Sequence, residues 1–194
     1  MTYQLTARHE AAHAVAAIMI GERVKVLQAH GKAGHCELAG NFPTPAKLRR
    51  DPAKARHWLF VLLAGYMCEE RGPAHRQFVF EWCRDRIDDV YMESLTTLKA
   101  GDDFDRMAYV LRCAGVSRRD AHPIIWSISW AVDSRLCHGR GRRAVQALSE
   151  ALQSAGGSAR SWTRVHAIVE PILCAPKAVQ TPYQYIALDR EFAA

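Results

Sequence analysis

A histidine pair near the N-terminus constrains this chain most. His9 and His13 lie four positions apart, with Glu10 directly after the first, in an HExxH pattern. Positions i and i+4 of an α-helix share one face, so two imidazoles at this spacing can bind one zinc ion, each at roughly 2.0–2.1 Å. Glu10 would then project beside the metal, where a carboxylate can act as general base on an attacking water. The pattern predicts a helix here and a zinc site on one of its faces.

The residues around the pair predict a helix followed by a hairpin. Residues 2–20 are mostly small and apolar, and Gly21 is a helix stop. Residues 22–30 alternate with period two, and a glycine-rich turn lets residues 35–38 return as a second strand. The free edge of such a sheet beside a zinc site can hold an extended peptide as an added strand.

Two further histidines, His30 and His35, fall in this hairpin. They are candidate metal neighbours, but exposed strand positions explain them better. We therefore expect both side chains to face solvent.

The rest of the chain is predicted to be mainly helical. Apolar residues recur at helical spacing in segments 53–71, 104–115, 123–138, 142–155 and 158–174. Asp51-Pro52 provides a cap and first position for the first of these, and Pro171 should end or kink the last. Residues 75–98 give a mixed signal, with a helical stretch near 88–93. The fold class is thus mainly α, a helical metallopeptidase-type domain at 1–175 with a small β-hairpin, followed by a tail at 176–194.

Composition narrows the class of protein. The net charge is +6, but the basic clusters are short and lack interleaved aromatic residues, so nucleic-acid binding is unfavoured. No run of eighteen apolar residues occurs, so no membrane span is expected. The six cysteines form no CxxC pair, which argues against a zinc ribbon. With no export signal, we expect reduced thiols and a cytoplasmic protein.

A catalytic zinc usually has three protein ligands and one water. The extended HExxHxxGxxH pattern is excluded because Ala16 and Met19 occupy the required positions. Glu69 and Glu70, at the end of the 53–71 helix, are candidates. Acids there oppose the helix dipole and need a partner such as a metal, a histidine or an arginine. The Asp102-Asp103 pair is the other candidate.

Three blocks in this chain resemble the FtsH-type ATP-dependent zinc metalloproteases, in the same order and at similar spacing. The HEAAHAV sequence from His9 resembles that family's HEAGHA segment. The LLAGYMCEE sequence at residues 62–70 resembles its LAGRAAEE helix, and the GDDFDRMA sequence from Gly101 resembles its SNDLxxAT segment. The resemblance covers roughly residues 5–170. Ala12 replaces the motif glycine, and Asp102 replaces its asparagine.

The resemblance implies particular roles for the matching residues. His9, His13 and Asp103 would be the zinc ligands, and Glu10 the catalytic base. Glu69, Glu70 and Asp102 would be candidates for contacts that orient a ligand. The chain contains no GxxxxGK[ST] sequence and no membrane anchor. It therefore resembles the peptidase domain alone, without the ATPase motor.

These observations favour a zinc-dependent endopeptidase that needs no ATP on its own. Its substrates would be flexible peptides or unfolded proteins, and an ATPase or another protein could act as partner in trans. Two alternatives remain. One is a non-catalytic metal-binding adaptor, favoured if the tail or residues 75–100 cover the site. The other is a basic helical domain that binds nucleic acid.

Overall fold

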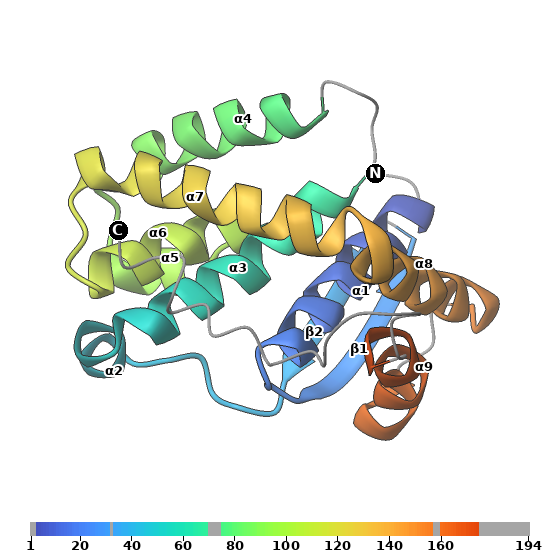
Figure 1. Cartoon of the computed structure of the whole chain (residues 1–194). Coiled ribbons are helices and arrows are strands. Elements are labelled where there is room, and N and C mark those ends of the chain that lie inside the picture. The colour runs from blue at the N-terminus through green and yellow to red at the C-terminus, as the bar shows by residue number, and fades with distance from the viewer. Residues whose placement is uncertain (1–2, 32, 70–74, 157–159, 175–194) are drawn as a thin grey trace.

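The computed structural model describes residues 3–31, 33–69, 75–156 and 160–174, and in these the chain is mainly helical with a small antiparallel sheet (Figure 1). The elements, in chain order, are α1 (Tyr3–Met19), β1 (Val24–His30), β2 (Ala33–Leu38), α2 (Pro45–Arg50), α3 (Pro52–Cys68), α4 (His75–Val90), α5 (Leu95–Ala100), α6 (Asp103–Cys113), α7 (Arg118–Leu136), α8 (Gly139–Ser154), β3 (Arg160–Ser161) and α9 (Trp162–Cys174). This confirms the mainly α fold class and the hairpin after the first helix.

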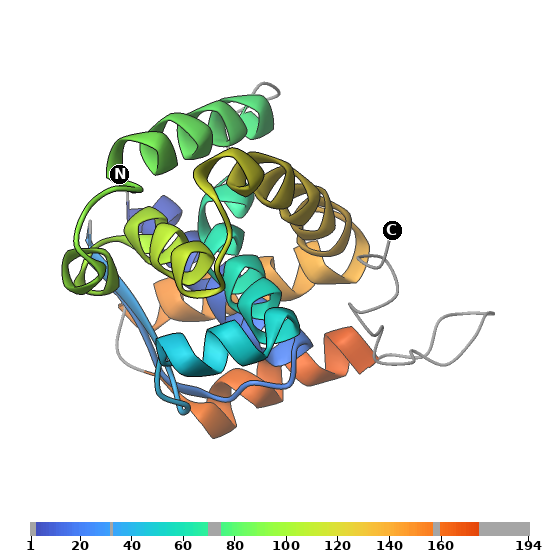
Figure 2. The same cartoon turned by 90° about the vertical axis from the view of Figure 1, so that its left-hand side faces the viewer.

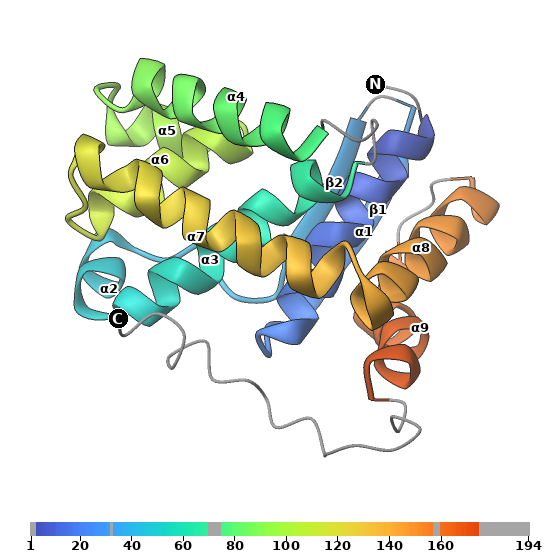
Figure 3. The same ribbon diagram turned by 45° about the horizontal axis from the view of Figure 1, so that its top comes forward.

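Helix α1 is buried along most of its length. It packs against α3, α8 and the β1–β2 hairpin, so protein surrounds it on several sides (Figure 3). Alanine is the best helix former and has a small side chain, which lets these neighbours approach closely. The alanines at positions 7, 11, 12, 14, 16 and 17 are all fully buried. The histidine pair therefore lies in the core of the fold.

The hairpin forms most of a three-stranded sheet with the order β2-β1-β3. Strands β1 and β2 pair antiparallel, with Gln28 opposite His35, and β3 pairs with the other side of β1. Buried Val24, Leu27 and Ala29 alternate with less buried residues along β1, as expected when one face covers a helix. Figure 2 shows the hairpin running along one side of the molecule. Strand β2 is thus an edge strand within the described part of the chain.

Helix α3 is the second buried helix. Asp51 caps it, accepting a hydrogen bond from the backbone N–H of Lys54 at 2.9 Å, with Pro52 in its first turn, as predicted. It packs against α1, α6 and α7. It ends at Cys68 rather than at residue 71, because the N–H of Glu69 turns back to the carbonyl of Tyr66.

Several boundaries differ from the sequence prediction. Residues 75–98 hold two helices, α4 and α5, and α2 was not predicted. Helix α7 begins five residues before Pro123, because the Ser117 side chain caps it by accepting from the N–H of Asp120. Helix α8 begins at Gly139, three residues before the predicted start.

The C-terminal elements also differ from the prediction. Strand β3 was not foreseen, and α9 begins after it, at Trp162. Pro171 lies in the last turn of α9, which continues to Cys174. The predicted cap Ser158 and the tail at 176–194 lie outside the described residues. None of the helices described is long and apolar enough to cross a bilayer.

Candidate metal site

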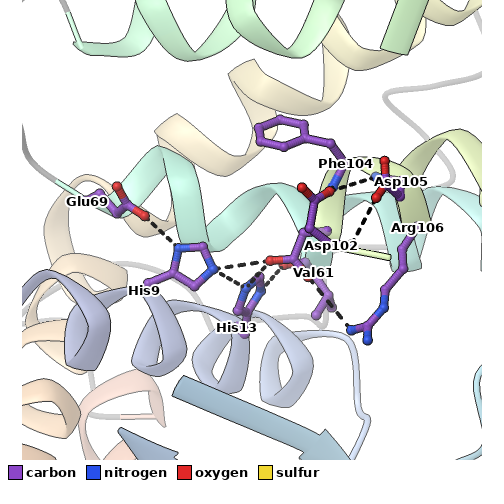
Figure 4. Close-up of polar contacts among 9 residues, drawn as sticks. His9, His13, Val61, Glu69, Asp102, Phe104, Asp105 and Arg106 are labelled. Atoms are coloured by element: carbon purple, nitrogen blue, oxygen red, sulfur yellow. Dashed lines mark hydrogen bonds and ion pairs between the residues drawn. The ribbon is translucent and has the colours of Figure 1, made fainter. Parts of the chain in front are cut away.

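The two histidines of α1 and an aspartate of α6 bring three donor atoms together. The Nε2 atoms of His9 and His13 lie 2.9 Å apart. Asp103 Oδ2 lies 3.2 Å from Nε2 of His9 and 3.0 Å from Nε2 of His13 (Figure 4). All three come from residues that the sequence analysis named as ligands, and they form a group that could hold a metal ion.

The other nitrogen of each ring is anchored to α3. Nδ1 of His13 lies 2.7 Å from the backbone carbonyl of Val61, and Nδ1 of His9 lies 2.7 Å from Oε1 of Glu69 (Figure 4). A carbonyl can only accept, so Nδ1 of His13 must carry a proton and donate it. In a neutral ring, the lone pair is then on Nε2, which faces the other histidine and Asp103. Glu69 can hold the His9 ring in the same way, the arrangement that orients many metal-binding histidines.

A glycine makes room for the two rings. A Cβ atom placed on Gly65 of α3 would lie 2.6 Å from Nε2 of both His9 and His13, closer than real Cβ contacts allow. Gly65 lies one turn after Val61 and one turn before Glu69, so the same face of α3 supplies both anchors and the space between them. Helix α3 thereby fixes the positions of both imidazoles.

Helix capping decides which aspartate faces the histidines. Asp102 is the N-cap of α6, and its Oδ1 accepts from the N–H groups of Phe104 and Asp105 at 2.9 and 3.0 Å. The Asp105 side chain accepts in return from the N–H of Asp102, which completes a capping box. Because the Asp102 side chain is used in this way, the carboxylate of Asp103 is the one that contacts the ring nitrogens of the two histidines.

Two arginines neutralise the acidic start of α6. Nη2 of Arg86, from α4, lies 3.0 Å from Oδ1 of Asp105. Nη1 of Arg106 lies 4.0 Å from Oδ1 of Asp103, on the carboxylate oxygen that does not face the histidines. The Oδ2 atom of Asp103 thus stays directed at the ring nitrogens.

The donor set fits a tetrahedral metal ion. Ligand atoms bound to zinc at about 2.0–2.1 Å in a tetrahedral arrangement lie roughly 3.3 Å from one another. The three separations of 2.9, 3.0 and 3.2 Å are close to this value. Two imidazoles and one carboxylate leave a fourth position for a water or a substrate.

The charges at the site favour a cation between the three donors. Burial lowers the pKa of His9, but hydrogen bonds to Asp103 and Glu69 outweigh burial and raise it to about 10. Burial raises the pKa of Asp103, but the charge of His13 and hydrogen bonds from both rings dominate and hold it well below its usual range. The group attracts positive charge, and a proton on His9 Nε2 would compete with a metal ion for the same donors.

Glu10 lies beside the metal ligands without belonging to them. It is buried, and it packs so closely under β2 that a Cβ on Gly34 would lie 2.4 Å from its Oε1. Burial raises the pKa of Glu10, and the nearby charges of His13 and His9 lower it in part. A carboxylate with a raised pKa beside a metal site is suited to accept and return a proton.

A cavity of about 250 Å³ reaches the site from solvent. Its lining residues come from α1, the hairpin, the following loop, α3 and the start of α6; they are Glu10, His13, Gly34, His35, Cys36, Leu38, Phe42, Trp58, Val61, Leu62, Tyr66, Gly101, Asp102, Asp103 and Arg106. Two of the three candidate ligands, His13 and Asp103, thus share one space with Glu10 and the edge strand β2. In the part of the chain that the structure describes, none of the lining residues comes from 75–100.

The sequence named most, but not all, of the residues in this arrangement. Glu69 contacts a ligand histidine, whereas Asp102 caps a helix instead, and Glu70 lies outside the described residues. His30 and His35 are exposed, as expected. Val61 and Gly65 were missed. The only signal for them was their spacing from Glu69, which is two helical turns for Val61 and one for Gly65.

No family model matches the chain, and no curated protein matches it.

Proposed function

We propose that this chain is a zinc-dependent metallopeptidase that hydrolyses peptide bonds in flexible or unfolded polypeptides. The observation that carries the proposal is the convergence of Nε2 of His9, Nε2 of His13 and Oδ2 of Asp103 within 3.2 Å, with Glu10 buried beside them. The resemblance of three ordered sequence blocks to the FtsH-type peptidases supports the same assignment.

In the proposed reaction, the residues of the site have different roles. Zinc, when bound by His9, His13 and Asp103, would polarise the scissile carbonyl and lower the pKa of water towards about 7. Glu10 would accept a proton from the attacking water and pass it to the leaving nitrogen as the C–N bond breaks. Glu69 would hold the His9 ring in the orientation that directs its Nε2 at the metal.

The shape of the site supports an extended substrate. Strand β2 is the outer strand of the sheet within the described residues, and four of its residues line the cavity: Gly34, His35, Cys36 and Leu38. An extended peptide can pair with such an edge through its backbone, which aligns it along the site without a fixed sequence. A folded substrate would first have to open, so an unfolding ATPase partner in trans would extend the substrate range.

The first experiment compares the wild-type chain with Glu10→Gln. Purified wild-type protein should contain one zinc ion per chain and cleave a casein-type unfolded substrate. Glu10→Gln should keep the zinc and lose roughly 10²–10⁴-fold in rate, because only the proton transfer is removed. Glu150→Gln, an exposed change in α8, is the matched control and should cleave normally. Absence of stoichiometric zinc, or unchanged cleavage by Glu10→Gln, would refute the proposal.

A further inference from the structure

Peptide hydrolysis places negative charge on the carbonyl oxygen of the substrate in the transition state. Enzymes commonly aim a fixed hydrogen-bond donor at that oxygen. The side chains that line the cavity and carry an N–H or O–H donor beyond the ligand set are those of Tyr66 and Trp58 of α3, His35 of β2 and Arg106 of α6. The indole nitrogen of Trp58 is fully buried in the protein, which leaves the other three as candidates. Of these, the donor held most rigidly is best placed for the role, because a preorganised donor need not reorient during the reaction.

The ring of Tyr66 is fixed on three sides. It meets the His9 ring edge-on, with centroids 4.8 Å apart at 90°. It stacks on Phe104 at 4.2 Å and 30°, and it contacts Trp82 at 5.4 Å. Phe104 is fully buried and follows Asp103 directly in the chain. Tyr66 is therefore held between the candidate ligand His9 and the aromatic rings of Phe104 and Trp82.

The hydroxyl of Tyr66 has no such partner. Within the described residues it makes no hydrogen bond, although its backbone carbonyl accepts one from His75. A phenol in a partly buried position usually finds a hydrogen-bond partner. An unmodified tyrosine is protonated at neutral pH, so this hydroxyl can donate to a group that enters the cavity.

The two competing donors are held less firmly. The side chain of His35 is 53% exposed, and its Nε2 lies 3.9 Å from Oε2 of Glu37. The side chain of Arg106 is 42% exposed, and its guanidinium is loosely paired with Asp103 at 4.0 Å. Each would lose conformational freedom on binding a substrate oxygen, a cost that the clamped Tyr66 ring avoids.

Tyr66 and Glu10 occupy different walls of the same cavity. Glu10 belongs to the wall formed by α1 and β2, where it packs against Gly34. Tyr66 belongs to the wall formed by α3 and α6, where it packs against Phe104. A substrate carbonyl between the walls can receive water from the side of Glu10 and direct its oxygen towards Tyr66.

We propose that Tyr66 is a further catalytic residue, whose hydroxyl donates a hydrogen bond to the carbonyl oxygen of the substrate as that oxygen becomes negative. The proposal rests on the peptidase function proposed above. The phenol keeps its proton throughout. The new C–O bond comes from water, the C–N bond breaks, and the proton of the water travels through Glu10 to the leaving amine. The resembling family has an arginine at the corresponding point of its LAGRAAEE block, so this role belongs to the present chain.

Tyr66→Phe tests the assignment, because it removes one oxygen and keeps the ring with its three contacts. We expect kcat for an unfolded substrate to fall by about 10²–10³-fold, the usual effect of deleting one such donor. KM should change by less than about threefold and the zinc content should stay at the wild-type level, since the hydroxyl acts on the transition state. Tyr91→Phe is the control. It deletes a hydroxyl that bonds the carbonyl of Val116, away from the site, and should leave kcat unchanged.

A second measurement is independent of turnover. The two proteins compared are Glu10→Gln and the double variant Glu10→Gln/Tyr66→Phe. Calorimetry measures how tightly each binds a peptide phosphonamidate, which is a tetrahedral anionic analogue of the transition state. Tyr66→Phe should weaken analogue binding at least tenfold and leave binding of the uncleaved peptide nearly unchanged.

The outcomes separate the two proposals. If the wild type cleaves peptide and Tyr66→Phe matches its kcat or its affinity for the analogue, the role of Tyr66 is refuted and the peptidase function stands. Loss of zinc in Tyr66→Phe would show a purely structural residue and would also refute it. If the wild type binds neither zinc nor the analogue, the proposed function itself fails.

Discussion

Gly65 and Glu69 of α3 set the geometry of the candidate metal site, although neither is one of its three donor residues. Gly65 leaves the space that the two imidazoles occupy, and Glu69 holds the outer nitrogen of the His9 ring. Both effects depend on one atom or one small group, so single substitutions isolate them.

Gly65→Ala should damage the site sterically. The added methyl group would meet Nε2 of both His9 and His13 at 2.6 Å, so at least one ring must rotate away. Zinc affinity, measured by competition with a chromophoric chelator, should fall by at least tenfold. Gly40→Ala is the matched control, because its Cβ meets only an ordinary contact at 3.5 Å. Wild-type affinity in Gly65→Ala would contradict the geometry of the site.

Glu69→Gln should weaken zinc binding without removing it. The amide oxygen can still accept from Nδ1 of His9, but the negative charge that makes the ring a better ligand is lost. Changes of this kind typically cost 10–100-fold in metal affinity. The same chelator competition measures it, with Glu93→Gln, an exposed position, as control. Equal affinities for the two variants would show that Glu69 has no effect on the ligand.

At the residue scale, the sequence could identify His9, Glu10 and His13, because their spacing alone places them on one helical turn. Asp103 was named only through the family resemblance. Its choice over Asp102 depends on the capping box of α6, a local pattern that residue spacing does not reveal. Gly65 could not be found from the sequence, since its role exists only once α3 packs on α1.

At the scale of elements, an ion pair joins the end of α4 to the start of α7. Asp88 lies near the C-terminus of α4 and Arg118 at the N-terminus of α7, so each charge opposes the dipole of its own helix. The two meet, with Arg118 Nε 2.7 Å from Asp88 Oδ1, and His122 Nε2 lies 3.2 Å from the same oxygen. The pair thus joins two helices and offsets two unfavourable end charges.

Asp88→Asn should reveal this pair through pH. The hydrogen bond from Arg118 lowers the pKa of Asp88, so the folded state holds the ionised form more strongly than the unfolded state does. Its stabilisation is present above the unfolded pKa, near 3.9, and is lost as pH falls through the folded value. The Tm of the wild type should exceed that of Asp88→Asn at pH 7, and the gap should close in acid. Asp85→Asn, whose carboxylate pairs with adjacent Arg84 alone among the described residues, should show a smaller gap at pH 7. A gap that persists in acid would rule out this linkage.

Long helices with strong periodicity were predictable from sequence, and their ends were not. The start of α7 was predicted at Pro123, but Ser117 caps the helix and it begins at Arg118, five residues earlier. The prediction missed this because a serine cap is a weaker sequence signal than a proline. The two residues of β3 form a strand only by pairing with Leu27 and Val26 of β1, more than a hundred residues earlier. A strand of two residues is too short to show the alternation of buried and exposed side chains by which a strand is predicted.

At the scale of the molecule, a bound metal would join α1 to α6 while α3 holds both histidines. Zinc binding by the folded state alone should therefore stabilise the whole domain. At a free zinc concentration of 100 times Kd, the gain is about 2.7 kcal/mol. For a chain of this size, that corresponds to a rise in Tm of roughly 5–10 °C.

Thermal unfolding with and without a chelator measures this effect. The wild type should lose the stabilisation when zinc is removed and recover it when zinc is returned. His13→Ala should have a low Tm that zinc does not change, because one of the three ligands is gone. A wild-type Tm that is insensitive to chelation would contradict a metal site in the folded state.

The position of the ligands in the chain has a consequence for protein synthesis. Asp103 follows His9 by 94 residues, so the ribosome makes the two histidines roughly 5–20 s before the carboxylate. Until α6 emerges and docks, the nascent chain holds a two-ligand half-site with no anchored third donor. The proposed peptidase site therefore lacks its third donor until Asp103 has been synthesised and α6 has folded against α3.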